Sequence, residues 1–274
     1  HDLRLAHLHE LAHPHRPDVR RLHLFELEDQ PWCPAILRDG GTAYITRFAD
    51  LAGLYDGLRP QLQALVDARP GHPVVDLCSG AGGPSRWMAD ALAEQGVAVH
   101  ATDLFPHARA LAHAQATARG ALSWSEAPVD AMNVPSEHTG PRTLFNGFHH
   151  FPPDEARRIL EDAVRAGEPI GVFEFVGRQL HAIPGMAGVP FAVMALLPFL
   201  RPFQWAWVPL TYVVPLLPAL VFWDGLVSCL RVYDVSELAE LVEGLDTYDW
   251  DIGTFPLPFP GHGTYLVGVP RAPC

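Results

Sequence analysis

A glycine-rich stretch over residues 74–85 carries the strongest chemical signal in the chain. It reads Val-Val-Asp-Leu-Cys-Ser-Gly-Ala-Gly-Gly-Pro-Ser, so a run typical of a buried strand leads directly into a turn and then a helix. Glycine accepts positive φ angles and lets a ligand approach the backbone closely. In a doubly wound α/β fold, this first strand-to-helix turn is the usual nucleotide crevice. The stretch therefore predicts a nucleotide-like ligand.

Two details of this turn disfavour a dinucleotide. The fingerprint GxGxxG seats a pyrophosphate on a helix N-terminus, but here Gly80-Ala-Gly82-Gly83 is followed by Pro84, so the third glycine is absent. An acid, Asp76, also lies in the strand ahead of the glycines. A carboxylate there repels phosphate and attracts a cation. We therefore expect Asp76 to bind a cationic group such as an amine.

Two more carboxylates follow at later positions of the predicted crevice. Asp103, followed by Leu104, lies 21 residues after Gly82, and a carboxylate at that strand end can accept hydrogen bonds from both hydroxyls of an adenosine ribose. Asp130 is followed by Ala131. A carboxylate beside a backbone N–H can hold the exocyclic amine and a ring nitrogen of adenine. The acids in this order predict a ligand that carries adenosine.

A second polar group follows the fourth predicted strand, in Thr143-Leu-Phe-Asn-Gly-Phe-His-His-Phe151. His149 and His150 would lie where strand ends meet the ligand crevice. Histidine is suited to removing a proton from a hydroxyl or amine near neutral pH. One of the two could instead cap the next helix or pack in the core. We expect Asn146 to contact the ligand or a second substrate.

Glu174 ends the fifth predicted strand, near the same crevice. It could polarise a substrate, or it could anchor the segment that follows through Arg178 or Arg231. An Asp224–Arg231 ion pair is a further structural hypothesis for the point where that segment rejoins the fold. The candidate catalytic residues are thus His149, His150 and Glu174.

These residues need a framework that brings strand ends together, and the chain supplies one from residue 74 onward. Short β-rich runs alternate with helical runs, which predicts a parallel sheet covered on both faces. The expected strands are 74–77, 98–102, 122–124, 143–148, 170–176, 249–254 and 264–269, and the expected helices are 84–95, 106–119, 153–166 and 235–243. The predicted fold class is α/β: a Rossmann-like, seven-stranded, mostly parallel sheet with an antiparallel C-terminal hairpin and helices on both faces.

Two regions lie outside that alternation. Residues 1–70 predict an N-terminal helical arm or lid, and residues 71–274 the main domain. Residues 178–228 form an apolar, helical insertion after the fifth strand, with Arg201 as the single charge between residues 183 and 223. Repeated prolines discourage straight membrane-spanning helices there. The insertion predicts a hydrophobic lid, a peripheral membrane contact or a homodimer interface.

The same residues resemble the class I S-adenosylmethionine-dependent methyltransferases, over about residues 70–180 and again over 231–270. Residues 74–83 are similar to the family's glycine-rich first motif, although Cys78 stands where the family usually has a glycine. Residues 143–151 are similar to its fourth motif, which lines the methyl-transfer site. The resemblance implies S-adenosyl-L-methionine as cofactor, S-adenosyl-L-homocysteine as product, and a cofactor site made of Asp76, Cys78, Gly80, Gly82, Asp103, Leu104, Asp130, Ala131 and Asn146.

We therefore expect methyl transfer from S-adenosylmethionine to a small hydrophobic acceptor that is lipid-like, isoprenoid or aromatic. An apolar insertion favours such an acceptor, because binding sites are mostly apolar with a few placed polar groups. Two alternatives remain open at this stage. One is a nucleotide-dependent oxidoreductase on the same fold, and the other is a membrane-associated protein that binds without catalysis.

Composition narrows the range of partners. The formal net charge is −12, all 19 basic residues are Arg, and they form no stripe, which disfavours a nucleic-acid partner. The four cysteines are scattered without a CxxC pair, which fits a reducing, cytoplasmic setting. His7, His9, His13 and His15 complete no recognisable set of metal ligands. We therefore expect no metal site.

Overall fold

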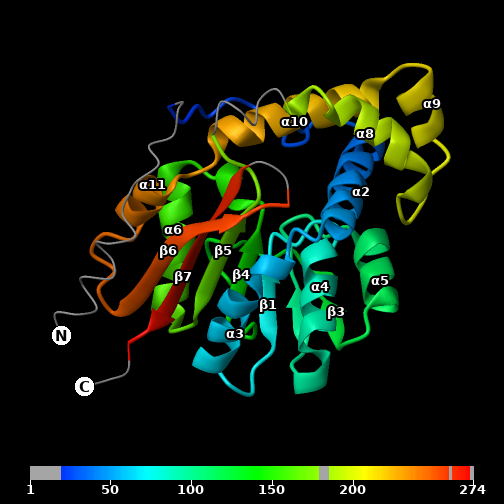
Figure 1. Ribbon diagram of the computed structural model, residues 1–274. Helices are drawn as coiled ribbons and strands as arrows, with labels where there is room; N and C mark the ends of the chain where they lie inside the picture. The colour runs from blue at the N-terminus through cyan, green and yellow to red at the C-terminus, as the bar shows by residue number, and fades with distance from the viewer. Residues whose placement is uncertain (1–19, 179–184, 259–260, 272–274) are drawn as a thin grey trace.

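The computed structural model describes residues 20–178, 185–258 and 261–271. Its centre is a seven-stranded sheet in the order β3-β2-β1-β4-β5-β7-β6 (Figure 1). Strands β3, β2, β1, β4 and β5 run parallel, and β7 pairs antiparallel with both β5 and β6. The strands are β1 (Val74–Leu77), β2 (Val99–Ala101), β3 (Leu122–Trp124), β4 (Arg142–Phe145), β5 (Ile170–Glu174), β6 (Tyr248–Pro256) and β7 (His262–Pro270). The predicted fold class is confirmed.

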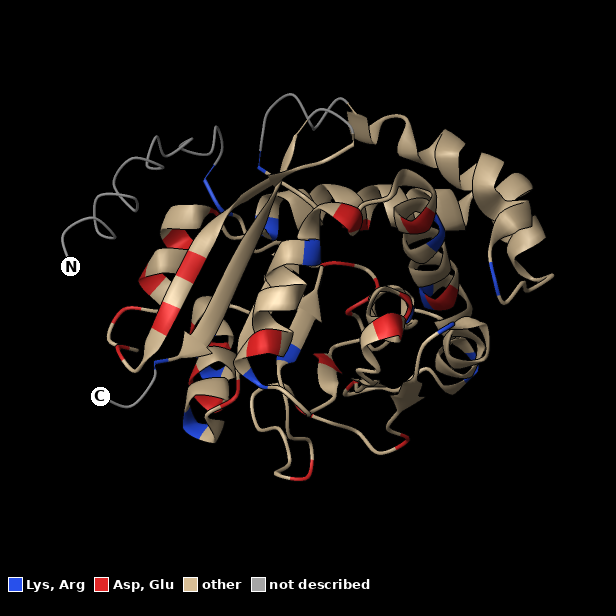
Figure 2. Ribbon diagram, turned by 60° about the horizontal axis from the view of Figure 1, so that its bottom comes forward, with Lys and Arg blue, Asp and Glu red and all other residues tan. Residues whose placement is uncertain are grey.

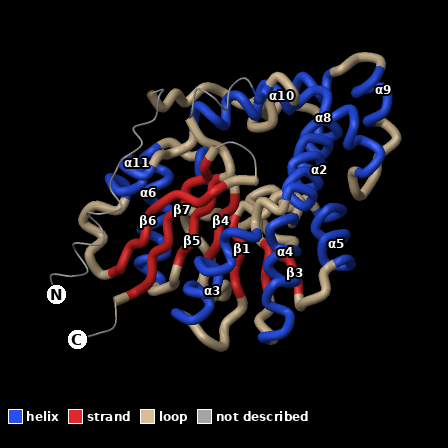
Figure 3. The backbone as a smooth tube through the Cα atoms, viewed as in Figure 1, coloured by secondary structure: helices blue, strands red, loops and turns tan. Residues whose placement is uncertain are grey.

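Helices cover both faces of this sheet, as Figure 3 shows. One face packs against α3 (Arg59–Ala68), α4 (Gly83–Leu92) and α5 (Ala108–Thr117), which contribute apolar side chains to a single core. The other face packs against α6 (Pro153–Ala166) and α11 (Val235–Leu241) around a second core. Two separate apolar layers are what a parallel sheet requires, because both of its faces are buried.

The strand ends differ from the sequence prediction in an informative way. Strand β4 was expected to reach residue 148 but ends at Phe145. Asn146 takes a left-handed φ of +48°, which breaks the extended backbone. Residues Phe148–His150 then form the short 3₁₀ helix η3. The strand therefore stops three residues early and turns both histidines out of the sheet.

The apolar insertion folds as a set of helices that packs on the N-terminal helix α2 (Ala35–Ala52). It contains α8 (Val189–Leu196), η4 (Leu197–Phe199), α9 (Trp207–Tyr212) and α10 (Leu216–Arg231). Figure 1 shows α10 running along the upper end of the molecule, from α9 to the region above β4 and β5. A β-carbon on Gly40 of α2 would lie 2.8 Å from the Leu217 side chain, so this glycine permits the close approach of α2 to α10.

The remaining short elements connect these layers: η1 (Asp56–Leu58) precedes α3, and η2 (Ala93–Gln95) follows α4. No single helix among the described residues is both long and apolar enough to cross a membrane. Helices α10 and α11 pass that test only when taken together, and they are bent by 65° at the break between them. The His-rich residues 7–15 lie outside the described residues.

Candidate functional site

The glycine loop between β1 and α4 adopts the backbone that its sequence predicts. Gly80 has φ +53° and Gly82 has φ +75°, both in the left-handed region that favours glycine. A β-carbon on Gly82 would lie 3.0 Å from the side chains of Leu111 and Ala114 in α5. The loop therefore has no room for a side chain at this position, and its N–H groups stay close to the C-terminal edge of the sheet.

Asp103 and the glycine loop are joined directly. The Gly80 N–H donates to Asp103 Oδ2 at 2.8 Å, and the Phe105 N–H donates to Asp103 Oδ1 at 2.8 Å. The carboxylate is thus fixed at the end of β2, the position predicted for a group that binds ribose. Leu104, beside it, is exposed and offers an apolar surface. Its role in packing against an adenine ring stays a prediction.

Asp76 needs a correction, because its carboxylate lies beneath the loop and not in the open crevice. The side chain is buried, and its two oxygens accept hydrogen bonds from Ser85 Oγ at 2.5 Å and Thr143 Oγ at 2.8 Å. Burial raises the pKa of Asp76 to about 7, although both hydroxyls act in the other direction. Asp76 therefore ties the first turn of α4 to β4, and direct contact with a ligand amine, which the sequence suggested, does not follow from this geometry.

Cys78 stands among three carboxylates. It adopts φ +52°, which accounts for the family's usual glycine at this place. Burial raises the pKa of the Cys78 thiol far above its ordinary value, and the charges of Asp103, Asp76 and Asp130 raise it further. Asp130 itself accepts a hydrogen bond from the Met132 N–H at 2.9 Å. Ala131 beside it is buried.

The charge around Cys78 points to a cationic ligand. Within residues 20–178, 185–258 and 261–271, Asp76, Asp103 and Asp130 accept hydrogen bonds from N–H and O–H groups, and none of them forms an ion pair with Arg or His. Clustered carboxylates without a cation nearby attract positive charge. S-adenosylmethionine carries a sulfonium and an ammonium group, so Asp103 and Asp130 fit that cofactor, while the buried Asp76 supports the loop.

Asn146 lies at the junction between this cofactor edge and the histidines. Its N–H donates to the Phe173 carbonyl at 2.7 Å, and its side-chain oxygen accepts from the Phe175 N–H at 3.4 Å. Asparagine tolerates the left-handed backbone better than most residues. Neither contact uses the side-chain nitrogen of Asn146. Its contact with the cofactor or an acceptor stays a prediction.

His149 and Glu174 form a buried pair. His149 Nδ1 lies 2.7 Å from Glu174 Oε2, and the His149 N–H donates to Glu174 Oε1 at 3.0 Å. The His149 ring is 1% exposed. Neither Arg178 nor Arg231 is a partner of Glu174, so the proposed anchoring role of Glu174 is wrong. Glu174 contacts His149 instead, while Arg178 pairs with Asp234 at 2.9 Å.

His150 lies on the outer side of the same turn, and its ring stacks on that of His149 with 4.4 Å between centroids. Its Nδ1 lies 2.9 Å from Asp29 Oδ1. Burial lowers the pKa of His150, but the hydrogen bond to Asp29 and the charges of Glu26, Asp29 and Glu28 outweigh it and raise the pKa to about 9. His150 therefore holds its proton at neutral pH in this arrangement.

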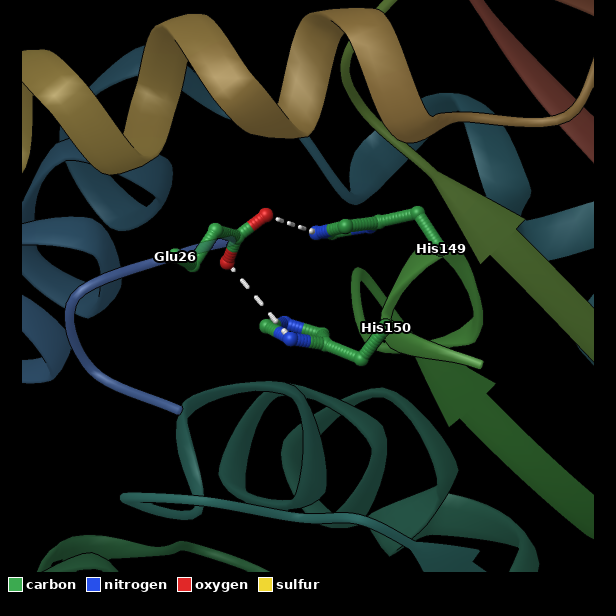
Figure 4. Close-up of side chains that lie close together, drawn as sticks. All are labelled: Glu26, His149 and His150. Atoms are coloured by element: carbon green, nitrogen blue, oxygen red, sulfur yellow. Dashed lines mark ion pairs between the residues drawn. The ribbon is translucent and has the colours of Figure 1, made fainter. Parts of the chain in front are cut away.

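The sequence analysis missed two residues of this group, Glu26 and Asp29. Figure 4 shows Glu26 reaching from the N-terminal segment to the edge of the two stacked imidazole rings, with one carboxylate oxygen facing each ring. Arg231, from the end of α10, lies 3.3 Å from Glu26 Oε1 and 2.8 Å from Asp29 Oδ2. The expected Asp224–Arg231 pair is wrong, because Asp224 accepts from the Leu27 and Glu28 N–H groups instead. No local pattern in the sequence joins residue 26 to residue 149.

Comparisons with known proteins agree with this geometry. Residues 74–171 match a family model described as a methyltransferase domain. The structure of the plantazolicin methyltransferase BpumL with bound S-adenosylhomocysteine has the same fold at a TM-score of 0.50, with 10% sequence identity over 86% of this chain and 97% of that one. An O-methyltransferase from neocarzinostatin biosynthesis, solved with S-adenosylmethionine and 2-hydroxy-5-methyl naphthoic acid, also scores 0.50, with 17% identity over 84% of this chain and 56% of that one.

A search of curated protein sequences finds no match to the chain. The family match nevertheless covers the glycine loop, Asp103, Asp130 and the turn at Asn146. The oxidoreductase alternative loses its basis, because the matched residues are those of a methyltransferase domain. Residues 74–171 are thus a methyltransferase domain, and the chain around them has the fold of methyltransferases that use S-adenosylmethionine.

Proposed function

We propose that this enzyme transfers the methyl group of S-adenosylmethionine to a small hydrophobic acceptor held by the insertion. The observation that carries the proposal is an open groove of about 440 Å³ at the end of the insertion. Its lining is apolar or aromatic apart from one charged side chain: Leu197, Pro198, Arg201, Phe203, Trp205, Val208 and Tyr212. Ligand sites commonly have this volume and this mixture of apolar walls with few polar groups.

The groove and a small crevice at the cofactor edge share one lining residue, Arg201. The crevice is also lined by His107, which precedes α5, and Ala81 of the glycine loop. Trp207, on the wall of that crevice, is held by a hydrogen bond from its Nε1 to the Ile36 carbonyl at 2.8 Å. The insertion thus supports an acceptor site that α2 and the glycine loop share. Arg201 favours an acceptor that carries an acidic group or a hydroxyl.

Methyl transfer here would rest mainly on positioning. Aligning a nucleophile with the sulfonium lowers the barrier without a dedicated base when the acceptor group is already nucleophilic. The buried His149 ring does not face open space, so His149 and Glu174 support the turn that carries Asn146. His150, whose side chain is 25% exposed, is the candidate among the three to touch an acceptor.

The test is a methylation assay with labelled S-adenosylmethionine and a panel of hydrophobic acceptors, beginning with bicyclic aromatic hydroxy acids. Trp205 is 81% exposed and lines the groove, so Trp205→Ala should raise the KM for the acceptor about 10-fold by removing aromatic contact area, with little effect on folding. Trp32→Ala is the matched control, because Trp32 is also an exposed tryptophan but lines neither the groove nor the crevice. Labelling confined to polar acceptors, or equal KM values in the two variants, would contradict the proposal.

We further propose that the end of the insertion contacts a membrane surface, from which a lipophilic acceptor could enter. Phe191, Trp205 and Val213 are exposed there, and the chain carries no acidic residue between 185 and 223, although its net charge is −12 (Figure 2). Exposed aromatic side chains on a surface without acidic residues favour an interfacial position. Sedimentation with phosphatidylcholine vesicles should fall several-fold in a Phe191→Ser, Val213→Ser variant with unchanged S-adenosylhomocysteine binding. A homodimer that ignores vesicles would overturn this part.

A further inference from the structure

Three potential metal ligands from two distant parts of the chain meet beside the cofactor edge. Glu26 comes from the N-terminal segment, and His149 and His150 come from η3 after β4 (Figure 4). One ligand atom of each lies within 4.8 Å of those of the other two. We propose that Glu26, His149 and His150 bind a divalent transition-metal ion, with Zn²⁺ as the best fit to their donors and spacing.

The spacing of the ligand atoms suits a metal better than a hydrogen bond. His149 Nε2 lies 3.6 Å from Glu26 Oε1, and His150 Nδ1 lies 3.5 Å from Glu26 Oε2. Both separations are too long for a good hydrogen bond. Ligands placed ~2.1 Å from a tetrahedral Zn²⁺ are about 3.4 Å apart along the edges of the tetrahedron. The observed separations are close to that edge.

Two donor atoms in this cluster are buried without a hydrogen-bond partner. His149 Nε2 and Glu26 Oε2 are both in this state among the residues that the structure describes, and each side chain is 1% exposed. A buried polar atom that lacks a partner costs free energy. Both atoms are lone-pair donors when the imidazole is neutral and the carboxylate is ionised, so a cation between them would satisfy both.

The surrounding contacts hold the ligands as metal sites require. Metal-binding histidines commonly donate their other ring N–H to a carboxylate, which fixes the tautomer. Glu174 occupies that place on His149 Nδ1, at 2.7 Å. Ser228 Oγ donates to Glu26 Oε1 at 3.0 Å, and Arg231 approaches the same oxygen, so the carboxylate is held with Oε1 toward His149 and Oε2 toward His150.

Asp29 lies on the outer side of the cluster, with its Oδ1 at 2.9 Å from His150 Nδ1 and its side chain 34% exposed. Binding of the ion to His150 Nδ1 would replace this contact and release the Nδ1 proton to the solvent. Asp29 or a water molecule can therefore be the fourth ligand, beside the two imidazoles and the Glu26 carboxylate. Nitrogen and oxygen donors in this combination suit Zn²⁺ and neighbouring first-row metals. The ion would clamp residues 26–29 onto the turn that follows β4.

The experiment is a titration of the full chain, freed of metal by a chelator, with Zn²⁺ by calorimetry and with Co²⁺ by visible absorption. A background variant with His7, His9, His13 and His15 changed to Gln removes competing histidines near the N-terminus. In that background we expect one ion per chain and a Co²⁺ spectrum typical of tetrahedral coordination. Glu26→Gln should weaken the affinity at least ~100-fold, since it removes the charged ligand while keeping its size.

His138→Gln in the same background is the matched control, because His138 stacks on His100 in a different part of the molecule. It should leave the stoichiometry and the spectrum unchanged. Hydrogen exchange of the wild-type chain gives a second measurement: the Leu27 and Glu28 amides, which donate to Asp224, should exchange more slowly with Zn²⁺ present. Absence of one-to-one binding, or equal affinity in Glu26→Gln and His138→Gln, would overturn the proposal. Neither measurement depends on the methyl acceptor.

Discussion

Two groups of carboxylates lie at the C-terminal edge of the same sheet, and their charges are compensated differently. The loop carboxylates Asp76, Asp103 and Asp130 are held by hydroxyl and backbone N–H donors. The cluster carboxylates Glu26 and Asp29 lie against His149, His150 and Arg231. Buried negative charge is costly without a positive partner. Asp103 and Asp130 therefore leave their compensation to a cationic cofactor, whereas Glu26 and Asp29 have Arg231 and His150 of the chain itself beside them.

The two groups of carboxylates should therefore affect different measurements: the loop group the affinity for the cofactor, and the cluster the free energy of unfolding. A residue of the loop group can be removed at modest cost to folding but at high cost to cofactor affinity. A cation removed from the cluster leaves carboxylates buried and unpaired, so the cost falls on folding itself. Three substitutions test the comparison, and they are ordered here by the free energy that each is expected to change.

The largest effect is expected at Arg231. Arg231→Met keeps the volume but removes the guanidinium from the buried Glu26 and leaves Asp29 with His150 alone, so the free energy of unfolding should fall by about 3–5 kcal/mol. Urea unfolding followed by circular dichroism measures this. Arg271→Met is the control, because the Arg271–Asp249 pair is exposed and worth at most about 1 kcal/mol. A similar loss of unfolding free energy in both variants would mean that Arg231 does not compensate the charges of Glu26 and Asp29.

The second effect is on cofactor affinity. Asp103→Ala removes the acceptor predicted for the ribose hydroxyls and also the partner of the Gly80 N–H. Calorimetry with S-adenosylhomocysteine should show a loss of about 100-fold, or about 2.7 kcal/mol, the size expected for hydrogen bonds to a charged group. Asp56→Ala, at an exposed ion pair with Arg59, should bind as the wild type does. Unchanged binding in Asp103→Ala would remove Asp103 from the cofactor site.

The third effect is a pH dependence of stability carried by Asp76. Its pKa is raised by burial from 3.8 to about 7, so the native state binds the proton more tightly than the unfolded chain does. The stabilisation is present below the unfolded pKa and is lost as pH rises through about 7. Between ~pH 5 and ~pH 8 the free energy of unfolding should fall by about 2–3 kcal/mol from this group.

Asp76→Asn should remove the part of this fall in the free energy of unfolding that Asp76 causes, because the amide does not titrate in this pH range. The other carboxyls whose pKa is raised, Glu28, Asp50 and Asp224, stay in both proteins, so the difference between the two pH profiles reports Asp76 alone. Parallel profiles would show that Asp76 is ionised in the native state throughout. Together with the Asp103 result, this would decide whether the loop group is anionic before the cofactor binds.

Local sequence patterns predicted the elements around the cofactor edge well. The glycine loop follows a strand of four buried residues, and α6 begins and ends at the residues expected, Pro153 and Ala166. Both depend on short-range physics: glycine permits a left-handed turn, and a proline with acids in the first turn begins a helix. The strand ends were less accurate, since the left-handed Asn146 that ends β4 is not visible in a run of β-formers.

The sequence by itself determined the fold class, the cofactor and the order of the loop carboxylates, because each is encoded within a few neighbouring residues. Only the tertiary structure decided that the buried Asp76 carboxylate accepts hydrogen bonds from Ser85 and Thr143. It alone also decided that Glu26 faces two histidines more than a hundred residues away in the sequence. These contacts depend on how α2, α10 and the segment before them pack over the sheet. Packing of that kind follows from the shape of the whole core, which no local spacing records.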